Sequence, residues 1–91
     1  MRVGNNMKII RTDDFEKHLQ KLPSATMRSF LSQLARFETN PRHPSLHTKK
    51  LKDLDGVYSI KIGRLHRALF FFTSDGNVTF FAIGHRKDIY R

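Results

Sequence analysis

Hydrophobic positions recur with a helical period in the first part of the chain. Phe15, Leu19 and Leu22 are separated by four and then three residues, so they form one apolar stripe along a helix. The helix is expected to open near Asp13, which can cap the first turn, while Glu16 can complete a capping box. This segment is therefore predicted to be an amphipathic helix with one buried face.

A second helical pattern follows a tight break at Pro23 and covers residues 24–38. Its apolar positions keep a helical period over three turns: Met27, Phe30, Leu31, Leu34 and Phe37. Two amphipathic helices joined by a short turn form a hairpin, and such a hairpin can cover one face of a sheet. These side chains are expected in the core rather than around a ligand.

The remaining hydrophobic segments alternate with the period of a strand. Residues 7–11 are predicted to form a short strand before the helices, and residues 57–62, 66–73 and 78–83 three strands after them. The short turns between the last three strands indicate an antiparallel meander. The predicted fold class is α+β: an N-terminal strand, a two-helix hairpin and a three-stranded antiparallel meander that completes a small sheet.

The last two predicted strands are apolar on both faces. Simple alternation places Phe70, Phe72, Phe80 and Ala82 on one set of positions and Leu69, Phe71, Phe81 and Ile83 on the other. The helical hairpin can bury only one face of the sheet. Some of the second face must therefore be covered by the loop before the meander, by a terminus or by a partner chain.

Length and composition limit the class of protein. A chain of 91 residues can bury one core, so residues 7–91 are expected to form a single domain after a disordered tail at residues 1–6. The chain has no Cys, which excludes disulfides, a thiol nucleophile and a Cys-based zinc site. No apolar run approaches the ~20 residues that span a bilayer, so a cytoplasmic protein without membrane contact is expected.

The charge is strongly positive, with 17 Lys and Arg against 8 Asp and Glu and a formal net charge of +9. Such an excess in a short chain favours contact with a nucleic acid, although an acidic protein partner would also explain it. His43 and His47 lie four apart in a basic loop at residues 40–50, but the loop offers no third ligand. No metal site and no cofactor are therefore expected.

Basic and proton-transferring residues gather in three segments that a meander could bring together. Cleavage of RNA without a metal needs a base for the 2′-oxygen, cations for the phosphorane and an acid for the departing 5′-oxygen. The segments hold, in order, Lys49, Lys50 and Lys52, then Arg67, and finally His85, Arg86 and Tyr90. Arg67 stands between His66 and Ala68 in an apolar strand, and a charge there needs a partner or a polyanionic ligand.

These segments carry a family resemblance. Residues 51–63, Leu-Lys-Asp-Leu-Asp-Gly-Val-Tyr-Ser-Ile-Lys-Ile-Gly, followed by His-Arg-Ala-Leu-Phe-Phe at 66–71, resemble the central block of the RelE/ParE toxin superfamily. The ending Gly-His-Arg-Lys-Asp-Ile-Tyr at 84–90 resembles the close of its RelE-type members. The resemblance spans about residues 8–90 and implies a RelE-like microbial RNase fold.

The resemblance also implies an activity and partners. It implies a bacterial toxin that enters the ribosomal A site, contacts rRNA and mRNA, and cuts the mRNA without a metal. It further implies an acidic antitoxin that holds the toxin inactive, and contact with operator DNA only through the antitoxin complex.

The resemblance assigns roles residue by residue. The basic residues before the second strand bind RNA, an Arg in the next strand contacts the scissile phosphate, and an Arg and a Tyr follow the last strand. The implied catalytic residues are Arg67, Arg86 and Tyr90, to which the chemistry of the segments adds Lys52 and His85. The expected RNA-binding residues are Lys49, Lys50, Lys52, Arg64 and Lys87.

Several alternatives stay open. The general base is not fixed, and the candidates are Lys52, His47, His66 and His85. Arg67 could instead pair with a carboxylate, for which Asp53, Asp55 and Asp88 are available. His85 could simply cap the strand exit, and Tyr90 could pack its ring on the sheet. As a whole, the protein could be a gyrase inhibitor of the ParE type without nuclease activity, or a non-toxic partner in an antitoxin complex.

Overall fold

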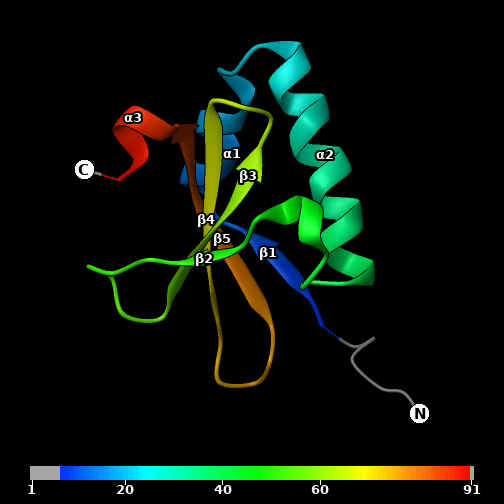
Figure 1. Cartoon of the computed structure of the whole chain (residues 1–91), viewed down its shortest axis with the longest axis vertical. Coiled ribbons are helices and arrows are strands. Elements are labelled where there is room, and N and C mark those ends of the chain that lie inside the picture. Colours follow the sequence, from blue (N-terminus) through cyan, green and yellow to red (C-terminus); the bar gives the residue numbers. More distant parts are fainter. Residues whose placement is uncertain (1–6, 91) are drawn as a thin grey trace.

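A five-stranded sheet with a helical hairpin on one face forms the body of the protein (Figure 1). The structure, a computed structural model, describes residues 7–90, so the tail expected at residues 1–6 lies outside the described residues. The strands are β1 (Ile9–Arg11), β2 (Lys49–Lys50), β3 (Val57–Ile62), β4 (His66–Phe72) and β5 (Val78–His85). The helices are α1 (Asp13–Gln20), α2 (Ser24–Thr39), the 3₁₀ helix η1 (Pro44–Leu46) and α3 (Arg86–Ile89).

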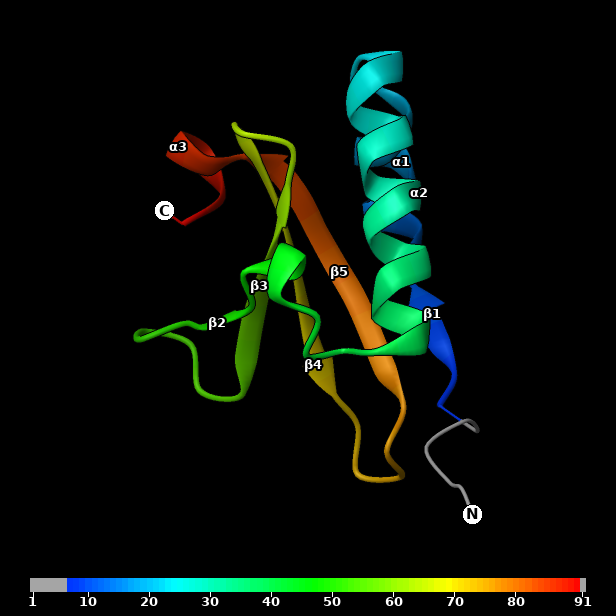
Figure 2. The ribbon, with the colours of Figure 1, turned by 45° about the vertical axis from the view of Figure 1, so that its right-hand side comes forward.

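The sheet order is β1-β5-β4-β3-β2, with β1 parallel to β5 and every other pair antiparallel. The predicted α+β class, the helical hairpin and the antiparallel meander are confirmed. The short elements η1 and β2 were predicted as loop, because neither has a hydrophobic pattern. Helices α1 and α2 lie on one side of the sheet and α3 on the other (Figure 2). We call the face opposite α1 and α2 the outer face.

The first helix is capped by Thr12, and the prediction that Asp13 caps it was wrong. The Oγ1 of Thr12 accepts a hydrogen bond from the backbone N–H of Phe15 at 3.1 Å. Asp13 lies one residue later, in the first turn. Glu16 does not close a capping box with it and instead forms an ion pair with Arg11 at 3.1 Å. Thr12 can cap the helix because its hydroxyl oxygen accepts the same kind of hydrogen bond as the carboxylate of an Asp.

The buried face of α2 differs by one position from the predicted stripe. Phe30 and Phe37 are fully buried, whereas Leu31 is 54% exposed. The residue that completes the buried face is Gln33, at 7% exposure. Hydropathy alone could not place a glutamine there, because the side chain is tolerated only through hydrogen bonds to groups distant in sequence.

An aromatic cluster fills the space between the hairpin and the sheet. The ring of Phe80 lies within 5.2–5.9 Å of the rings of Phe15, Phe30, Phe37 and Phe70, in tilted or edge-to-face arrangements. Such geometries are favoured by aromatic pairs, and burial of large rings is a main source of stability. The cluster therefore fixes the hairpin against β4 and β5.

A β-bulge in β5 breaks the predicted alternation. Leu69 pairs with Ala82, but the next residue of β4 pairs with Phe80, so Phe81 has no partner in the register. An extra residue in one strand interrupts the alternation, so the residues after it point to the opposite face from the one that simple alternation predicts. Ile83 therefore joins the core with Phe80, while Ala82 lies on the outer face. The prediction that Ala82 shares a face with Phe80 was wrong.

The end of the chain covers part of the outer face. Ser59 and Leu69 on that face are 1% and 3% exposed. Tyr90, which follows α3, donates a hydrogen bond from its hydroxyl to the Oγ of Ser59 at 3.2 Å. Of the three expected covers, the C-terminal segment is the one that the structure places here. Another part of the face stays open, since Phe71 and Ile10 remain 36% and 47% exposed.

Candidate nucleic-acid interface

Strand register places two cations side by side on the outer face. Residues directly opposite each other on neighbouring strands share a face. Lys61 of β3 pairs with Arg67 of β4, and Arg67 pairs in turn with Gly84 of β5. The next row on the same face consists of Ser59, Leu69 and Ala82. The cationic row thus adjoins the row that the C-terminal segment covers.

The short helix α3 brings two more cations to this row. Ile89 lies over Gly84, where a β-carbon would be 3.5 Å from its Cδ1. The backbone N–H of Arg86 donates to the carbonyl of Leu65 in the β3–β4 turn at 2.7 Å. Helix α3 is therefore held at both of its ends against the sheet. Because the helix is fixed in this way, Arg86 and Lys87 lie beside the cationic row.

A cavity of about 650 Å³ opens at this place, and we call it the sheet cavity. It is lined by His47, Thr48, Lys49, Lys61, Arg67, Arg86, Lys87 and Tyr90. Five of these eight residues are Lys or Arg, and none is acidic. The lining combines cations, an imidazole and a phenol, which are the groups that bind phosphates and move protons.

The sheet cavity unites most of the residues expected to act together. Those that line it are Lys49, Arg67, Arg86, Lys87 and Tyr90. The residues that lie elsewhere are Lys50, Lys52, Arg64 and His85. The three segments chosen from the sequence therefore do converge, although not with every residue assigned to them.

The two lysines of β2 are neighbours in the sequence but lie on opposite faces of the sheet. Lys49 pairs with Ser59, which lies on the outer face, whereas Lys50 pairs with Tyr58 on the face that carries the core. Successive side chains of a strand point to opposite faces. Lys52 follows in the loop and lines a smaller cavity formed by residues 51–54, Ile89 and Tyr90. Lys52 thus lies outside the lining of the sheet cavity.

His85 lies on the opposite face of the sheet from the sheet cavity. It pairs with His66, which pairs with the buried Ile62, and the two imidazole rings are 5.6 Å apart. The Nδ1 of His85 accepts a hydrogen bond from the backbone N–H of Lys87 at 3.1 Å, so His85 caps α3. The capping role considered from the sequence is the one that the geometry shows.

Three residues of the sheet cavity were not among the expected catalytic and RNA-binding residues: His47, Thr48 and Lys61. Lys61 had a detectable signal. Lys61 faces Arg67 across a hairpin whose turn spans residues 63–65, so the predicted strand ends already implied their pairing. His47 was considered only as one of several possible bases. Its backbone has a φ of +47°, in the left-handed region, and no other non-glycine among residues 7–90 has a positive φ. Nothing in the sequence marks that conformation.

Arg67 has no carboxylate partner in the described part of the chain. Between residues 7 and 90, the ion pair within 4.0 Å is that of Arg11 and Glu16. The guanidinium of Arg67 instead donates to the carbonyl of His66 at 2.7 Å and to that of Arg64 at 3.3 Å. Like charges directly opposite on a sheet are unfavourable, and an anion between Lys61 and Arg67 would relieve the repulsion.

Tyr90 is fixed at one end and open at the other. Its hydroxyl is anchored on Ser59 at 3.2 Å, while the whole residue remains 46% exposed. A ring that is held in this way loses little entropy when a flat group stacks on its free face. The structural role considered from the sequence and a role in base stacking are therefore compatible.

The comparison with protein families is decisive for the class. Residues 9–90 match the family described as the ParE toxin of type II toxin–antitoxin systems, parDE. The chain belongs to this family. It is therefore a toxin of a type II toxin–antitoxin system within the RelE/ParE superfamily. No curated protein sequence is significantly similar to this chain.

Solved structures share the fold of this toxin. The RelE–RelB complex from the archaeon Pyrococcus horikoshii OT3 matches with 21% identity and a TM-score of 0.73, over 90% of this chain and 97% of that chain. A YoeB/ParE toxin from Agrobacterium tumefaciens matches with 16% identity and a TM-score of 0.73, over 88% of this chain and 99% of that chain. The intact E. coli RelBE complex matches with 18% identity and a TM-score of 0.69, over 87% of this chain and 95% of that chain. The predicted RelE-like fold is confirmed.

Among residues 7–90, no helix is long and apolar enough to cross a membrane. No group of three or more His, Asp or Glu side chains in that range is arranged to hold a metal ion.

The environment of His66 predicts a pH-dependent stability of the toxin. Partial burial, His85 and Arg67 lower the pKa of His66 from its ordinary value of 6.5. Below that value the unfolded chain binds more protons than the folded one, so the free energy of unfolding falls as the pH falls. Urea unfolding of the toxin should therefore shift to lower midpoints from about pH 7.5 to about pH 5.5. The shift should be smaller for His66→Gln, and an equal shift in both proteins would contradict this account.

Proposed function

We propose that the toxin is a ribosome-dependent endoribonuclease that cleaves mRNA at the sheet cavity without a metal ion. The observation that carries this proposal is the lining of that cavity, where five cations, an imidazole and a phenol meet without an acidic residue. A site that only docked on a protein would be expected to offer apolar anchors instead. Cations and proton-transferring groups in one place fit a phosphodiester better.

The reaction proposed is an attack of the RNA's own 2′-oxygen on the adjacent phosphorus. The bond from phosphorus to the 5′-oxygen breaks, and the products are a 2′,3′-cyclic phosphate and a 5′-hydroxyl. Negative charge accumulates on the phosphorane as the new bond forms. Arg67 and Arg86 line the cavity together and supply guanidinium groups that stabilise this charge.

Proton transfer is assigned by position. Of the four candidate bases, His47 is the one that lines the sheet cavity beside Arg67 and Arg86. An imidazole can accept the 2′ proton near neutral pH. Lys61 stands opposite Arg67 on a rigid strand and can give a proton to the departing 5′-oxygen. Tyr90, anchored on Ser59, would stack on a base and orient the sugar.

Lys49 and Lys87 would hold the strand through phosphate contacts, as would the basic surface around the cavity. The ribosomal A site, which presents mRNA among rRNA phosphates, suits a chain with a net charge of +9. His85 receives a positioning role in this proposal, because it caps α3 and so places Arg86 and Lys87.

Substitutions should separate these roles in a purified translation system, where cleavage is followed by mapping of new mRNA 3′ ends. His47→Ala should slow cleavage by about 10²–10⁴-fold, as expected for loss of a general base. Arg67→Ala and Arg86→Ala should each slow it by about 10²–10³-fold. His85→Ala should have a smaller effect, because the residue caps α3 rather than lining the cavity.

The matched controls are His18→Ala and Lys17→Ala on the exposed side of α1, which should cleave at the parental rate. Parental cleavage by both His47→Ala and Arg67→Ala would overturn the site assignment. Intact mRNA with normal translation, together with blocked DNA supercoiling, would overturn the nuclease itself. That outcome would favour the second candidate, a gyrase inhibitor, for which the description of the matching family as ParE toxins is the supporting observation.

We also propose that an acidic antitoxin covers the open part of the outer face and neutralises the sheet cavity. Ile10 pairs with Thr79, which pairs with Phe71, so these residues form one row across three strands. The ring of Phe81 lies 5.6 Å from that of Phe71 and extends this apolar patch. The P. horikoshii and E. coli matches are toxin–antitoxin complexes. In this proposal the toxin is cytoplasmic and reaches operator DNA only through the antitoxin.

Phe71→Glu should weaken binding of the cognate antitoxin by at least about 30-fold, near 2 kcal/mol, if the patch is central to the interface. The cause is a new charge in an apolar contact that faces an acidic partner. Leu31→Glu is the matched control, because Leu31 is also an exposed apolar residue, at 54% against 36% for Phe71, but lies on α2, away from the outer face. Titration calorimetry of the purified pair measures both. Loss of binding in Leu31→Glu alone would place the antitoxin elsewhere.

A further inference from the structure

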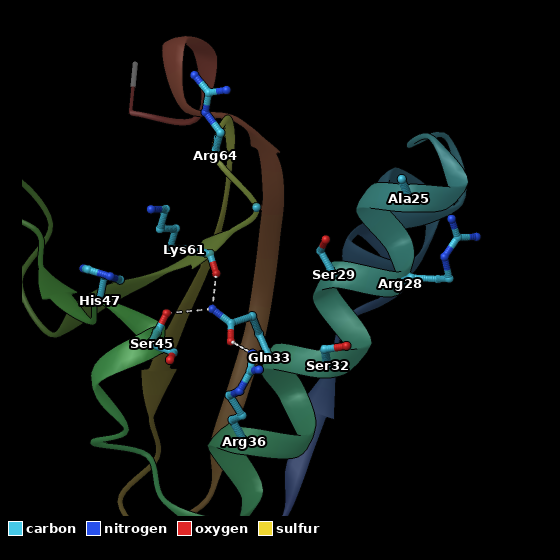
Figure 3. A pocket seen from close by; sticks show the side chains of 11 residues that line it. Ala25, Arg28, Ser29, Ser32, Gln33, Arg36, Ser45, His47, Lys61 and Arg64 are labelled. Atoms are coloured by element: carbon cyan, nitrogen blue, oxygen red, sulfur yellow. Dashed lines mark hydrogen bonds between the residues drawn. The ribbon is translucent and has the colours of Figure 1, made fainter.

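A second basic cavity lies beyond the free edge of β3, between that strand and α2 (Figure 3). We call it the edge cavity. Its volume is about 650 Å³, and it is lined by Ala25, Arg28, Ser29, Ser32, Gln33, Arg36, Ser45, His47, Lys61, Gly63 and Arg64. Four of these residues are Lys or Arg, three are Ser, and none is acidic. The charge and the hydroxyl groups are those of a surface that binds phosphate oxygens.

The edge of β3 is closed here by a side chain rather than by a strand. The two-residue strand β2 pairs with Tyr58 and Ser59 and goes no further along β3. Beyond it, the Nε2 of Gln33 donates to the carbonyl of Lys61 at 2.7 Å and to that of Ser45 at 2.9 Å. A free strand edge needs partners for its backbone groups, and this amide provides one.

The amide of Gln33 also fixes the walls of the edge cavity. Its Oε1 accepts a hydrogen bond from Arg36 at 2.9 Å, so α2, η1 and β3 are joined through one buried side chain. Figure 3 shows Arg64 and Arg36 at opposite ends of the cavity, with Ser29 pointing into the space between them. The cavity is therefore a rigid groove with a cation at each end.

The edge cavity is continuous with the sheet cavity. His47 and Lys61 line both. In Figure 3 the amine of Lys61 extends away from Gln33, while its carbonyl oxygen points to Gln33. Lys61 thus presents its charge on the outer face and its backbone to the edge cavity. A basic surface runs without interruption from α3, across the outer face and around the edge of β3, to α2.

We propose that the edge cavity holds the sugar–phosphate backbone of the RNA strand on one side of the cleaved bond. This inference rests on the proposed nuclease function and adds a path for the strand. A strand that enters the sheet cavity can follow the basic surface around β3 without leaving it. An acidic peptide is a poorer occupant, because the lining offers one apolar side chain, Ala25, and no pocket for an anchor. Arg36 and Arg64 would contact successive phosphates.

Binding of single-stranded RNA tests this path separately from cleavage. Fluorescence anisotropy would compare a labelled trinucleotide with an oligonucleotide of about 12 nucleotides, the range of a basic single-strand groove. Both carry 2′-O-methyl groups throughout, which prevents attack by the 2′-oxygen. The parent toxin should bind the longer strand more tightly. Arg36→Ala/Arg64→Ala should reduce the salt dependence of that binding by about 1.4 in slope, about 0.7 for each lost phosphate contact.

The trinucleotide should bind this double variant and the parent equally. The matched control, Lys17→Ala/Lys21→Ala, removes the same charge from α1 and its C-cap, outside both cavities, and should keep the parental slope. Arg64→Ala alone should show half the change. Within residues 7–90 the side chain of Arg64 makes no hydrogen bond, and only its backbone carbonyl accepts one, so this single variant is a check on misfolding of the double variant. Thermal unfolding of each variant verifies the fold.

Equal slopes in all variants would overturn the path, and so would equal losses in the double variant and its control. A longer strand that binds no tighter than the trinucleotide would overturn it as well. A failure of the proposed function has a different result: mRNA would stay intact in the translation assay, while the longer strand would still bind more tightly than the trinucleotide. A binding defect confined to the antitoxin would assign the edge cavity to that partner and overturn the RNA path.

Discussion

The register of the β3–β4 hairpin holds Lys61 and Arg67 opposite each other, and much of the interface follows from that pairing. Two cations at neighbouring positions of a sheet repel each other, so the fold tolerates a local cost that packing elsewhere must offset. The aromatic cluster around Phe80 supplies that packing on the opposite face. The sheet thus separates a cohesive apolar face from a face on which Lys61 and Arg67 have no carboxylate partner among residues 7–90.

The C-terminal segment turns this row of charge into a cavity. Helix α3 returns over the outer face, where Ile89 contacts the small Gly84 and Tyr90 bonds to Ser59. A β-carbon at Gly84 would lie 3.5 Å from the Cδ1 of Ile89, so α3 packs directly on the cationic row. Around the free edge of β3, Gln33 has a comparable part, because its amide joins α2 to Lys61 and Ser45. The basic surface that lines the two cavities therefore depends on tertiary contacts at both ends.

Periodicity predicted the elements well, because their buried faces consist of large apolar residues. The helices, the three meander strands and the α+β class follow from Phe15, Leu19 and the alternating segment at residues 57–62. The bulge at Phe81 could not be predicted, because an extra residue in one strand leaves a hydrophobic run unchanged. The burial of Gln33 in place of Leu31 could not be predicted either, because it depends on hydrogen bonds from Gln33 to residues distant in the sequence.

The candidate site was predictable where strands fix the direction of side chains. Arg67, Arg86 and Tyr90 converge as expected, because they lie in or directly after paired strands. His47 lines the sheet cavity and His85 does not, whereas His85 was the one expected among the catalytic residues. The position of His47 depends on its left-handed backbone conformation after η1. The face on which His85 lies depends on the bulge in β5, which changes the alternation of the residues after it. Neither property has a sequence signal.

The most direct test of this account is to map the bound strand. Amide and side-chain chemical shifts of the toxin would be followed by NMR during titration with the uncleavable 2′-O-methyl RNA. The account predicts the largest changes at Lys61, Arg67, Arg86 and Tyr90, with small changes at His66 on the opposite face. Large changes at His66 and His85, with the cationic row unaffected, would contradict it.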